Sequence, residues 1–262
     1  MSELKALLFD VDGTLVDTKE LHRQAFNQPF LEFGLGCNWS DELYAELLAV
    51  SGGAERIAHY IDWLRPAAEK TRLCRLISAV HREKTRIYRT LIASNKALLG
   101  PGVGRLIEEA HEAGLKIGLA ASSAVEDVHA LLAAAMYPAQ RDAMRAIVSA
   151  NQVNRKKPAP EHLRNAANPT GRSGGGVRRI RGFDQWHRGR QGRPPRHGRE
   201  PSRWTKDRDF GDADLVVDSL GEPNMPLSPR DAARIGGARW LGLQIEGVRT
   251  TSTFMRPARM QA

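Results

Sequence analysis

The sequence predicts an α/β fold with a doubly wound parallel sheet and an inserted α-helical cap. Short apolar runs alternate with helical patterns, which is typical of parallel sheets with right-handed crossovers. A long block of helical periodicity, residues 17–96, separates the first apolar run from the second. The polar residues DVDGT follow directly on the first run, at the strand end where open α/β sheets bind ligands. We therefore expect a Rossmann-like core of residues 1–16 and 97–262, with 17–96 as the cap.

Each element follows from its local pattern. We expect buried strands where short apolar runs occur, in LKALLF (4–9), LKIGLAAS (115–122), AIVSA (146–150) and DADLVVDSL (212–220). Three- and four-residue spacing of apolar residues predicts helices through the cap and in PGVGRLIEEAHEAG (101–114), AVEDVHALLAAA (124–135) and SPRDAARIGGA (228–238). Ser40 is placed to cap a helix that starts at Asp41, and Gly114 to end the helix before it.

Composition limits the classes of protein. The chain has 262 residues, and 41% of them are hydrophobic, which is enough for a globular core. No apolar run approaches the roughly 20 residues that span a bilayer, and the first residues, MSELKALLFD, lack an export signal. Two cysteines, Cys37 and Cys74, make no disulfide framework. These features predict a cytoplasmic protein with no membrane partner, and we expect a monomer.

The motif DVDGT carries the chemistry. Asp10 and Asp12 are carboxylates two residues apart on one loop, and Gly13 allows a sharp turn. Their mutual repulsion favours a cation between them, and Mg²⁺ prefers such oxygen ligands together with substrate phosphate. One carboxylate can attack phosphorus while the other moves a proton. The alternative reading of a lone DxDG is a solvated Asp-Gly turn. The full DVDGTLVDT after an apolar strand is a far more specific signal for a catalytic site.

DVDGTLVDT resembles the opening motif of the haloacid dehalogenase superfamily of phosphatases. The resemblance implies that Asp10 is the nucleophile and Asp12 the acid and base, and that the Asp10 carboxylate and the Asp12 main-chain carbonyl bind Mg²⁺. KKPAP (156–160) resembles the superfamily's lysine motif, so Lys157 would screen the charge of the phosphoryl group. The motif's hydroxyl at the second strand is replaced by Ala121, and Ser122 or Ser123 would take its place.

The cap resembles the CbbY group, phosphatases of Calvin-cycle operons that act on xylulose 1,5-bisphosphate. ELHRQAFN (20–27), the acidic helix near Trp39 and SGGAERI (51–57) carry the likeness, together with residues 201–223. The resemblance implies that the following residues face the substrate from the cap: Glu20, His22, Tyr44, Gly53 and Arg56. The group's KER after the paired glycines is AER here, because Ala54 replaces the lysine, and this loosens the inference on substrate.

One segment departs from this pattern. Residues 161–200 hold ten Arg, no Lys and three acids, whereas the other 222 residues carry 29 basic and 27 acidic groups. The segment is rich in Gly and Pro without apolar periodicity, so we expect it to be disordered. It occupies the place of a helix and a strand that ends in the acidic motif completing the metal site.

Codons can be chosen so that the segment, read one base later, encodes what is missing. Val177–Gln185 then gives CVAFEDST, an apolar strand that ends in acids, with helical patterns on both sides. We hypothesise compensating one-base shifts near 160 and 200. For the printed chain we therefore predict weak Mg²⁺ binding and little activity.

Three alternatives remain beside the sugar-phosphate phosphatase. A sugar phosphomutase of the same fold would return the phosphoryl group to the sugar. An inactive relative would lack turnover. A basic nucleic-acid-binding protein would use the arginines, but it needs an ordered basic surface or aromatic stacking platforms, and the segment offers only Trp186. We therefore expect a small sugar phosphate as partner and no nucleic acid.

Overall fold

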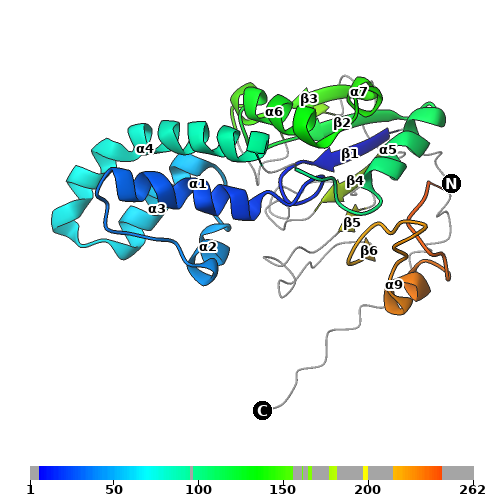
Figure 1. Cartoon of the computed structure of the whole chain (residues 1–262), viewed down its shortest axis with the longest axis horizontal. Coiled ribbons are helices and arrows are strands. Elements are labelled where there is room, and N and C mark those ends of the chain that lie inside the picture. Colours follow the sequence, from blue (N-terminus) through cyan, green and yellow to red (C-terminus); the bar gives the residue numbers. More distant parts are fainter. Residues whose placement is uncertain are drawn as a thin grey trace, which may run out of the picture.

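A six-stranded, all-parallel sheet forms the core of the molecule (Figure 1). The structure is a computed structural model, and it describes residues 6–94, 97–155, 161, 165–166, 177–181, 197–199 and 215–243. The strand order is β3-β2-β1-β4-β5-β6, so β1 lies in the interior of the sheet between β2 and β4. The predicted doubly wound parallel sheet with a helical insertion is confirmed.

The strands and core helices alternate in the predicted order. The strands are β1 (Ala6–Asp10), β2 (Lys116–Ala120), β3 (Met144–Val148), β4 (Val177–Arg181), β5 (His197–Arg199) and β6 (Leu215–Val216). The helices of the core are α5 (Val103–Glu112), α6 (Val125–Ala135), α7 (Pro138–Asp142), the 3-10 turn η1 (Ala150–Gln152) and α9 (Pro229–Arg234). The predicted strand at 212–220 is wrong in extent, because within the described residues only Leu215 and Val216 pair with β5.

Alternation along β1 divides the core into two layers. Leu7 and Phe9 face a large cluster built with α5 and α6, while Ala6 and Leu8 face a smaller cluster that includes Val148 and Ala166. Successive side chains of a strand point to opposite faces, so this five-residue strand is buried on both sides. The apolar run of the sequence is therefore continuous rather than alternating, as parallel strands require.

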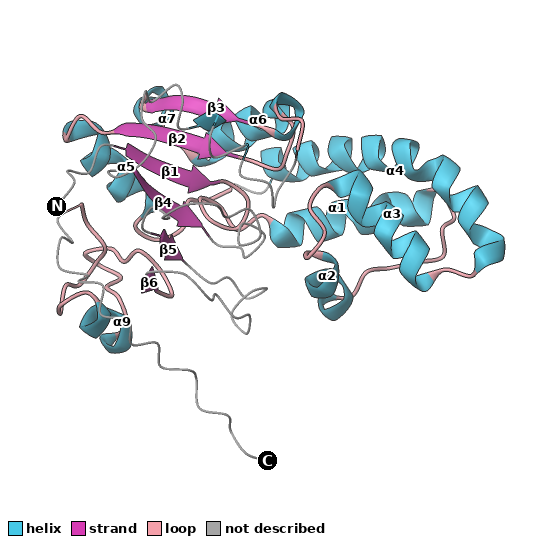
Figure 2. Cartoon of the chain, turned by 180° about the vertical axis from the view of Figure 1, so that it is seen from behind, coloured by secondary structure: helices cyan, strands magenta, loops and turns pink. Residues whose placement is uncertain are grey.

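The cap is a separate helical layer inserted between β1 and β2. Its helices are α1 (Lys19–Glu32), α2 (Asp41–Leu47), α3 (Gly53–Leu64) and α4 (Ala67–Ser94). It has its own core around Phe26, Phe30, Trp39 and Tyr44, which are all at most 1% exposed. Figure 2 shows the cap beyond the arrowheads of the strands, that is, at the carboxyl edge of the sheet.

Two turn predictions are confirmed. Ser40 Oγ accepts a hydrogen bond from the Leu43 N–H at 3.2 Å, so it caps α2. Gly114 has φ of +70° directly after α5, where its N–H donates to the carbonyl of His111. Gly13 has φ of +80° within DVDGT, so the predicted sharp turn also occurs.

Two short parts of the segment 161–200, which we expect to be disordered, form strands in the structure. Val177–Arg181 forms β4 beside β1, with Leu7 opposite Arg178 and Phe9 opposite Ile180, and His197–Arg199 forms β5. Parallel pairing uses main-chain groups alone, so a strand can form on this edge of β1 without an apolar sequence. Composition describes side chains only, so it does not indicate strands that form through main-chain pairing.

Candidate active site

A cavity of about 930 Å³ lies between the cap and the carboxyl edge of the sheet. Asp10 ends β1 and Asp12 follows in the next turn; both are buried, at 6% and 8% exposed, and both line the cavity. The turn is closed by hydrogen bonds from the N–H groups of Gly13 and Thr14 to carbonyls of Val16 and Val11. The local sequence thus places both carboxylates at the carboxyl edge of the sheet.

The carboxylate of Asp12 is held from both sides. Oδ1 accepts from Thr18 Oγ1 at 2.8 Å, and Nε2 of His22 and the hydroxyl of Tyr88 lie 3.3 and 3.4 Å from it. Oδ2 accepts a 2.7 Å hydrogen bond from Ser123. Three of these partners come from the cap side and Ser123 comes from the core. Asp12 is therefore the residue at which the two layers meet.

The pKa of Asp12 lies well below its usual value. Burial alone would raise it, but the hydrogen bonds from His22 and Ser123 and the positive charge of Lys19 outweigh that effect. Without substrate, Asp12 is a carboxylate at neutral pH. A negatively charged phosphoryl group beside it would raise its pKa, because two like charges cannot easily share one site.

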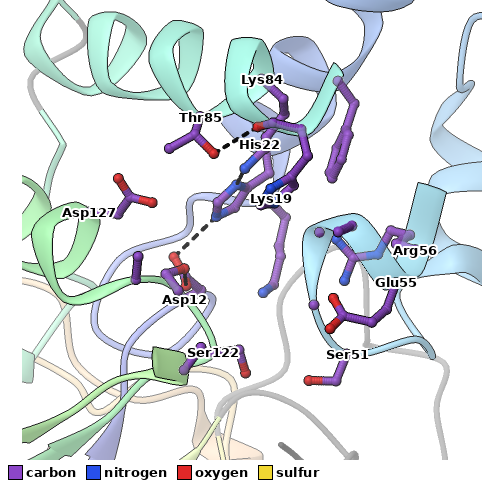
Figure 3. A pocket seen from close by; sticks show the side chains of 18 of the residues that line it. Asp12, Lys19, His22, Ser51, Glu55, Arg56, Lys84, Thr85, Ser122 and Asp127 are labelled. Atoms are coloured by element: carbon purple, nitrogen blue, oxygen red, sulfur yellow. Dashed lines mark hydrogen bonds and ion pairs between the residues drawn. The ribbon is translucent and has the colours of Figure 1, made fainter. Parts of the chain in front are cut away.

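A buried lysine and histidine support Asp12 from the cap. Lys84 Nζ lies 2.7 Å from His22 Nδ1, and the imidazole stacks on Tyr88 with ring centroids 3.9 Å apart. Burial, followed by the charge of Lys84, lowers the pKa of His22 to about 3, so the ring is neutral near pH 7. With Lys84 donating to Nδ1, Nε2 carries the proton and donates to Asp12. Figure 3 shows this chain of contacts.

The far wall of the cavity is the loop between α2 and α3. Arg56 donates from Nε to the Leu47 carbonyl at 3.0 Å and from Nη2 to the Val50 carbonyl at 2.8 Å. Its guanidinium also lies over the rings of Phe26 and Tyr44, at 5.8 and 5.6 Å from their centroids. Arg56 therefore shapes the loop while it lines the cavity. Burial raises the pKa of Tyr44 to about 12, so its phenol stays protonated.

The glycines of this wall are required by space. Gly52 has φ of +96°, and a Cβ on Gly53 would lie 2.5 Å from His81 Nε2. Both lie at the start of α3, whose first residues line the cavity. A side chain on Gly53 would press on His81 and one on Gly52 would press on Glu55, so the SGGAER pattern keeps the first turn of α3 open to the cavity.

An ion pair joins the cap and the core beside the cavity. Arg89 on α4 contacts Asp127 in the first turn of α6, with Nε and Oδ1 2.5 Å apart. Asp127 is 8% exposed, whereas the Arg89 side chain is 46% exposed. Because α4 belongs to the cap and α6 to the core, the pair links the two layers at one edge of the cavity.

Most of the predicted site residues come together here. Those that line the cavity are Asp10, Asp12, His22, Tyr44, Gly53, Arg56, Ser122 and Ser123. Lys157 lies outside the described residues. Glu20 does not line the cavity; its carboxylate binds the Arg23 side chain at 2.8 and 3.0 Å and accepts from Gln24. The prediction that Glu20 faces the substrate is therefore not supported.

Sequence reasoning missed Lys19, Lys84 and Asp127. Lys19 follows the DVDGTLVDT motif directly and could have been noticed as a positive charge adjoining that motif. Lys84 sits in an amphipathic pattern on α4, and only the packing reveals that it is buried. Ser123 was expected to bind phosphate, but here its hydroxyl binds Asp12.

The fold and the cavity define a hydrolase with an α/β core and a helical cap, and comparison with known proteins identifies its family. The chain matches the haloacid dehalogenase-like hydrolase family over residues 7–174. It is 37% identical over 227 residues to the plasmid CbbY protein of Cupriavidus necator, covering 86% of this chain and 89% of that one. The chain belongs to the haloacid dehalogenase-like hydrolases, in their CbbY group, and is a phosphoric monoester hydrolase.

Solved structures agree. A structure of CbbY from Rhodobacter sphaeroides in complex with phosphate is 34% identical, with a TM-score of 0.74, over 82% of this chain and 94% of that one. A mutant of that protein in complex with xylulose-(1,5)bisphosphate is 33% identical, with a TM-score of 0.72, over 84% and 98%. In the part of the chain that the structure describes, no helix is long and apolar enough to cross a membrane.

Proposed function

We propose that this protein is a Mg²⁺-dependent sugar-phosphate phosphatase that hydrolyses xylulose 1,5-bisphosphate through an aspartyl phosphate on Asp10. The observation that carries the proposal is the pair Asp10 and Asp12, buried at the carboxyl edge of β1 beneath a basic cap cavity. The complex of the CbbY relative with xylulose-(1,5)bisphosphate supports the substrate. By the same likeness, the enzyme would serve the Calvin cycle.

In the first step, a carboxylate oxygen of Asp10 attacks phosphorus as the bond from phosphorus to the sugar oxygen breaks. Asp12 gives its proton to that oxygen, so the sugar leaves as a neutral alcohol. The proton is on Asp12 because the incoming phosphoryl group raises the pKa of that carboxyl. Ser123, Thr18 and His22 keep the carboxyl aimed at the leaving oxygen.

In the second step, Asp12, now a carboxylate, takes a proton from water. The resulting hydroxide attacks the phosphorus of the aspartyl phosphate, the bond from phosphorus to Asp10 breaks, and inorganic phosphate leaves. The neutral imidazole of His22 cannot supply a competing charge at this stage, since its pKa is about 3. The cap excludes bulk water, which strengthens each electrostatic contact.

The residues present fit Mg²⁺ only in part. The ion takes octahedral oxygen ligands and often keeps several waters, with one or two carboxylates and substrate phosphate. The Asp10 carboxylate and the Asp12 main-chain carbonyl would hold it, and the described residues contain no group of three acidic, His or Cys side chains that would complete the site. When bound, the ion neutralises charge on the phosphoryl oxygens. We therefore expect weak binding of the ion.

Phosphate release from xylulose 1,5-bisphosphate tests the proposal. The full chain should slowly release one phosphate per molecule with Mg²⁺ and none with Asp10→Asn, which keeps the shape of the side chain but removes the nucleophile. The variant should still bind the sugar. Formation of an isomeric sugar phosphate without net phosphate release, followed by ³¹P NMR, would instead identify a phosphomutase. Wild-type chain that binds the sugar without either reaction would identify an inactive relative.

A further inference from the structure

Lys19, the first residue of α1, lies across the turn that carries the catalytic aspartates. A methyl group placed on Gly13 would lie 3.0 Å from Lys19 Cε and 3.7 Å from its Nζ. The side chain of Lys19 thus runs against the bare main chain of Gly13, and its ammonium ends beside Asp12. No larger residue at 13 would leave this path open.

The ammonium of Lys19 stands among the charges of the reaction. Asp12 and Asp10 are the two groups whose negative charge most favours its protonated form, whereas burial opposes that form. Lys19 lines the cavity, and Figure 3 places it between Asp12 on one side and Ser51, Glu55 and Arg56 of the cap on the other. A phosphoryl group on its way to Asp10 has to pass through this region.

Three other basic side chains of the cavity serve different partners. Lys84 contacts His22, Arg56 binds the carbonyls of Leu47 and Val50, and Arg89 pairs with Asp127. These three contacts lie in the cap or at its junction with α6. Lys19 is the basic side chain that lies against the DVDGT turn itself.

We propose that Lys19 is a further phosphate-binding residue, whose ammonium contacts oxygens of the transferring phosphoryl group beside Asp10 and Asp12. The inference rests on the proposed phosphoryl transfer at Asp10. A phosphoryl group adds at least one negative charge to a site that already holds two carboxylates. An ammonium beside both carboxylates offsets that charge in a buried place, where electrostatic interactions are strong. The ammonium supplies this charge from the chain itself, whether or not a metal ion is bound.

The test compares Lys19→Met, Lys19→Arg and Lys70→Met. Methionine keeps the length and the apolar stem of lysine without its charge. Lys70 pairs with the exposed Asp62 on the cap surface, so Lys70→Met is a matched loss of one lysine charge away from the cavity. Two probes each carry a single phosphorus-like centre: orthovanadate, measured by calorimetry, and p-nitrophenyl phosphate, measured by turnover. Neither has a second phosphate that could report a distant site.

We expect Lys19→Met to weaken orthovanadate binding and to lower kcat/KM for p-nitrophenyl phosphate by roughly 10-fold to 100-fold, the effect of losing one charged hydrogen bond. Lys19→Arg should retain more of both, and Lys70→Met should match the wild type. Orthovanadate affinity in Lys19→Met equal to that of the wild type, with unchanged thermal unfolding, would overturn the proposal.

Three further results are decisive. If Lys19→Met does not fold, Lys19→Arg and Lys19→Gln are compared with each other: equal orthovanadate affinity in a charged and a neutral variant also overturns the proposal. If the wild type binds orthovanadate through Lys19 yet hydrolyses no sugar phosphate, the proposed function fails while the role of Lys19 stands. If the wild type binds no orthovanadate, the role of Lys19 fails.

Discussion

Nζ of Lys84 lies 2.7 Å from Nδ1 of His22, and both side chains are buried in the cap beneath the stacked ring of Tyr88. Burial lowers the pKa of Lys84 to about 7. The contact fixes which imidazole nitrogen holds the proton and so aims the other nitrogen at Asp12. Two residues of the cap thereby control the orientation of a carboxyl that belongs to the core.

The first prediction concerns the stability of Lys84→Met as a function of pH. The lysine titrates near 10.5 when unfolded and near 7 when folded. As pH falls from 10.5 to 7, the unfolded chain takes up this proton first, so the wild type loses stability that the methionine variant keeps. The unfolding free energy of Lys84→Met relative to wild type should rise by a few kcal/mol, on the order of the pKa shift.

Urea unfolding at pH 9.5 and at pH 7 measures that difference. Lys70→Met is the control, because Lys70 lies on the exposed side of the cap, and its difference from wild type should not change with pH in this way. The same relative stability of Lys84→Met at both pH values would show that Lys84 is not buried as an amine. Turnover should also fall, since His22 then loses the donor that sets its tautomer.

The second prediction separates Ser123 from Ser122. Ser123 donates to Asp12 Oδ2, whereas Ser122 lines the cavity beside it. Ser123→Ala should raise the pKa of Asp12 and lower kcat by roughly 10-fold, the worth of one hydrogen bond to a charged group. Because the pKa of Asp12 rises, the acid limb in the profile of kcat against pH should move to higher pH in Ser123→Ala. Ser122→Ala should change KM more than kcat and leave that limb in place; an equal shift in both variants would contradict the assignment.

Sequence alone could predict the part of the site that a short motif specifies. Asp10, Asp12 and the turn at Gly13 lie on one continuous stretch after an apolar strand, so their meeting is decided locally. Lys84 is buried because α1 packs against α4, where it contacts His22, a residue 62 positions earlier. The local periodicity of α4 does not reveal this contact. The contact of Glu20 is local instead: its carboxylate accepts from Arg23, one helical turn away, and its predicted role toward the substrate stays a prediction.

The positions of the first three strands along the chain were predictable from the sequence, and those of β4 and β5 were not. Apolar runs indicated β1, β2 and β3, which agree within two residues of the predicted bounds. β4 consists of VRRIR and has no such signal, because its pairing with β1 comes from main-chain hydrogen bonds. Apolar composition therefore locates strands that are buried on both faces. The position of β4 instead depends on its pairing with β1.

A third prediction tests the ion pair of Arg89 and Asp127 as a latch between the layers. Neither residue carries out chemistry, so Arg89→Met and Asp127→Asn should each leave the protein folded. A double-mutant cycle on unfolding free energy should give a coupling of about 0.5–2 kcal/mol, since one partner is nearly buried and the other is half exposed. The coupling should shrink in 1 M salt. A coupling of zero at low salt would mean that the pair does not join the cap to the core.

A fourth prediction concerns Arg56. Lysine cannot reproduce the two hydrogen bonds that the guanidinium gives to the carbonyls of Leu47 and Val50. Arg56→Lys should therefore lose about 1–3 kcal/mol of stability, and the misplaced loop should raise KM for xylulose 1,5-bisphosphate. For the stability measurement, Arg86→Lys is a suitable control, because Arg86 makes an exposed pair with Glu83 on the same cap. Equal melting temperatures for Arg56→Lys and wild type would show that the hydrogen bonds of Arg56 do not stabilise the loop.

The fifth prediction concerns the strand next to the nucleophile. β4 lies between β1 and β5, where a parallel sheet normally holds apolar residues, yet its sequence VRRIR carries three arginines. Because Phe9 pairs with Ile180, Arg181 stands at the same sheet edge as Asp10. Reading the codons one base later gives CVAFE over 177–181 and Asp at 182, so the missing acid would fall at this edge.

Resequencing codons 155–205 and expressing both chains tests this. The chain with the alternative frame should unfold at a higher temperature, because an apolar strand replaces one rich in arginine, and it should bind Mg²⁺ at least ten-fold more tightly, since an added carboxylate completes the oxygen ligands. The printed chain should bind the ion weakly and turn over slowly. If the gene confirms the printed frame and the printed chain binds Mg²⁺ as tightly as the alternative one, the compensating shifts did not occur, and Asp10 and Asp12 suffice for the metal.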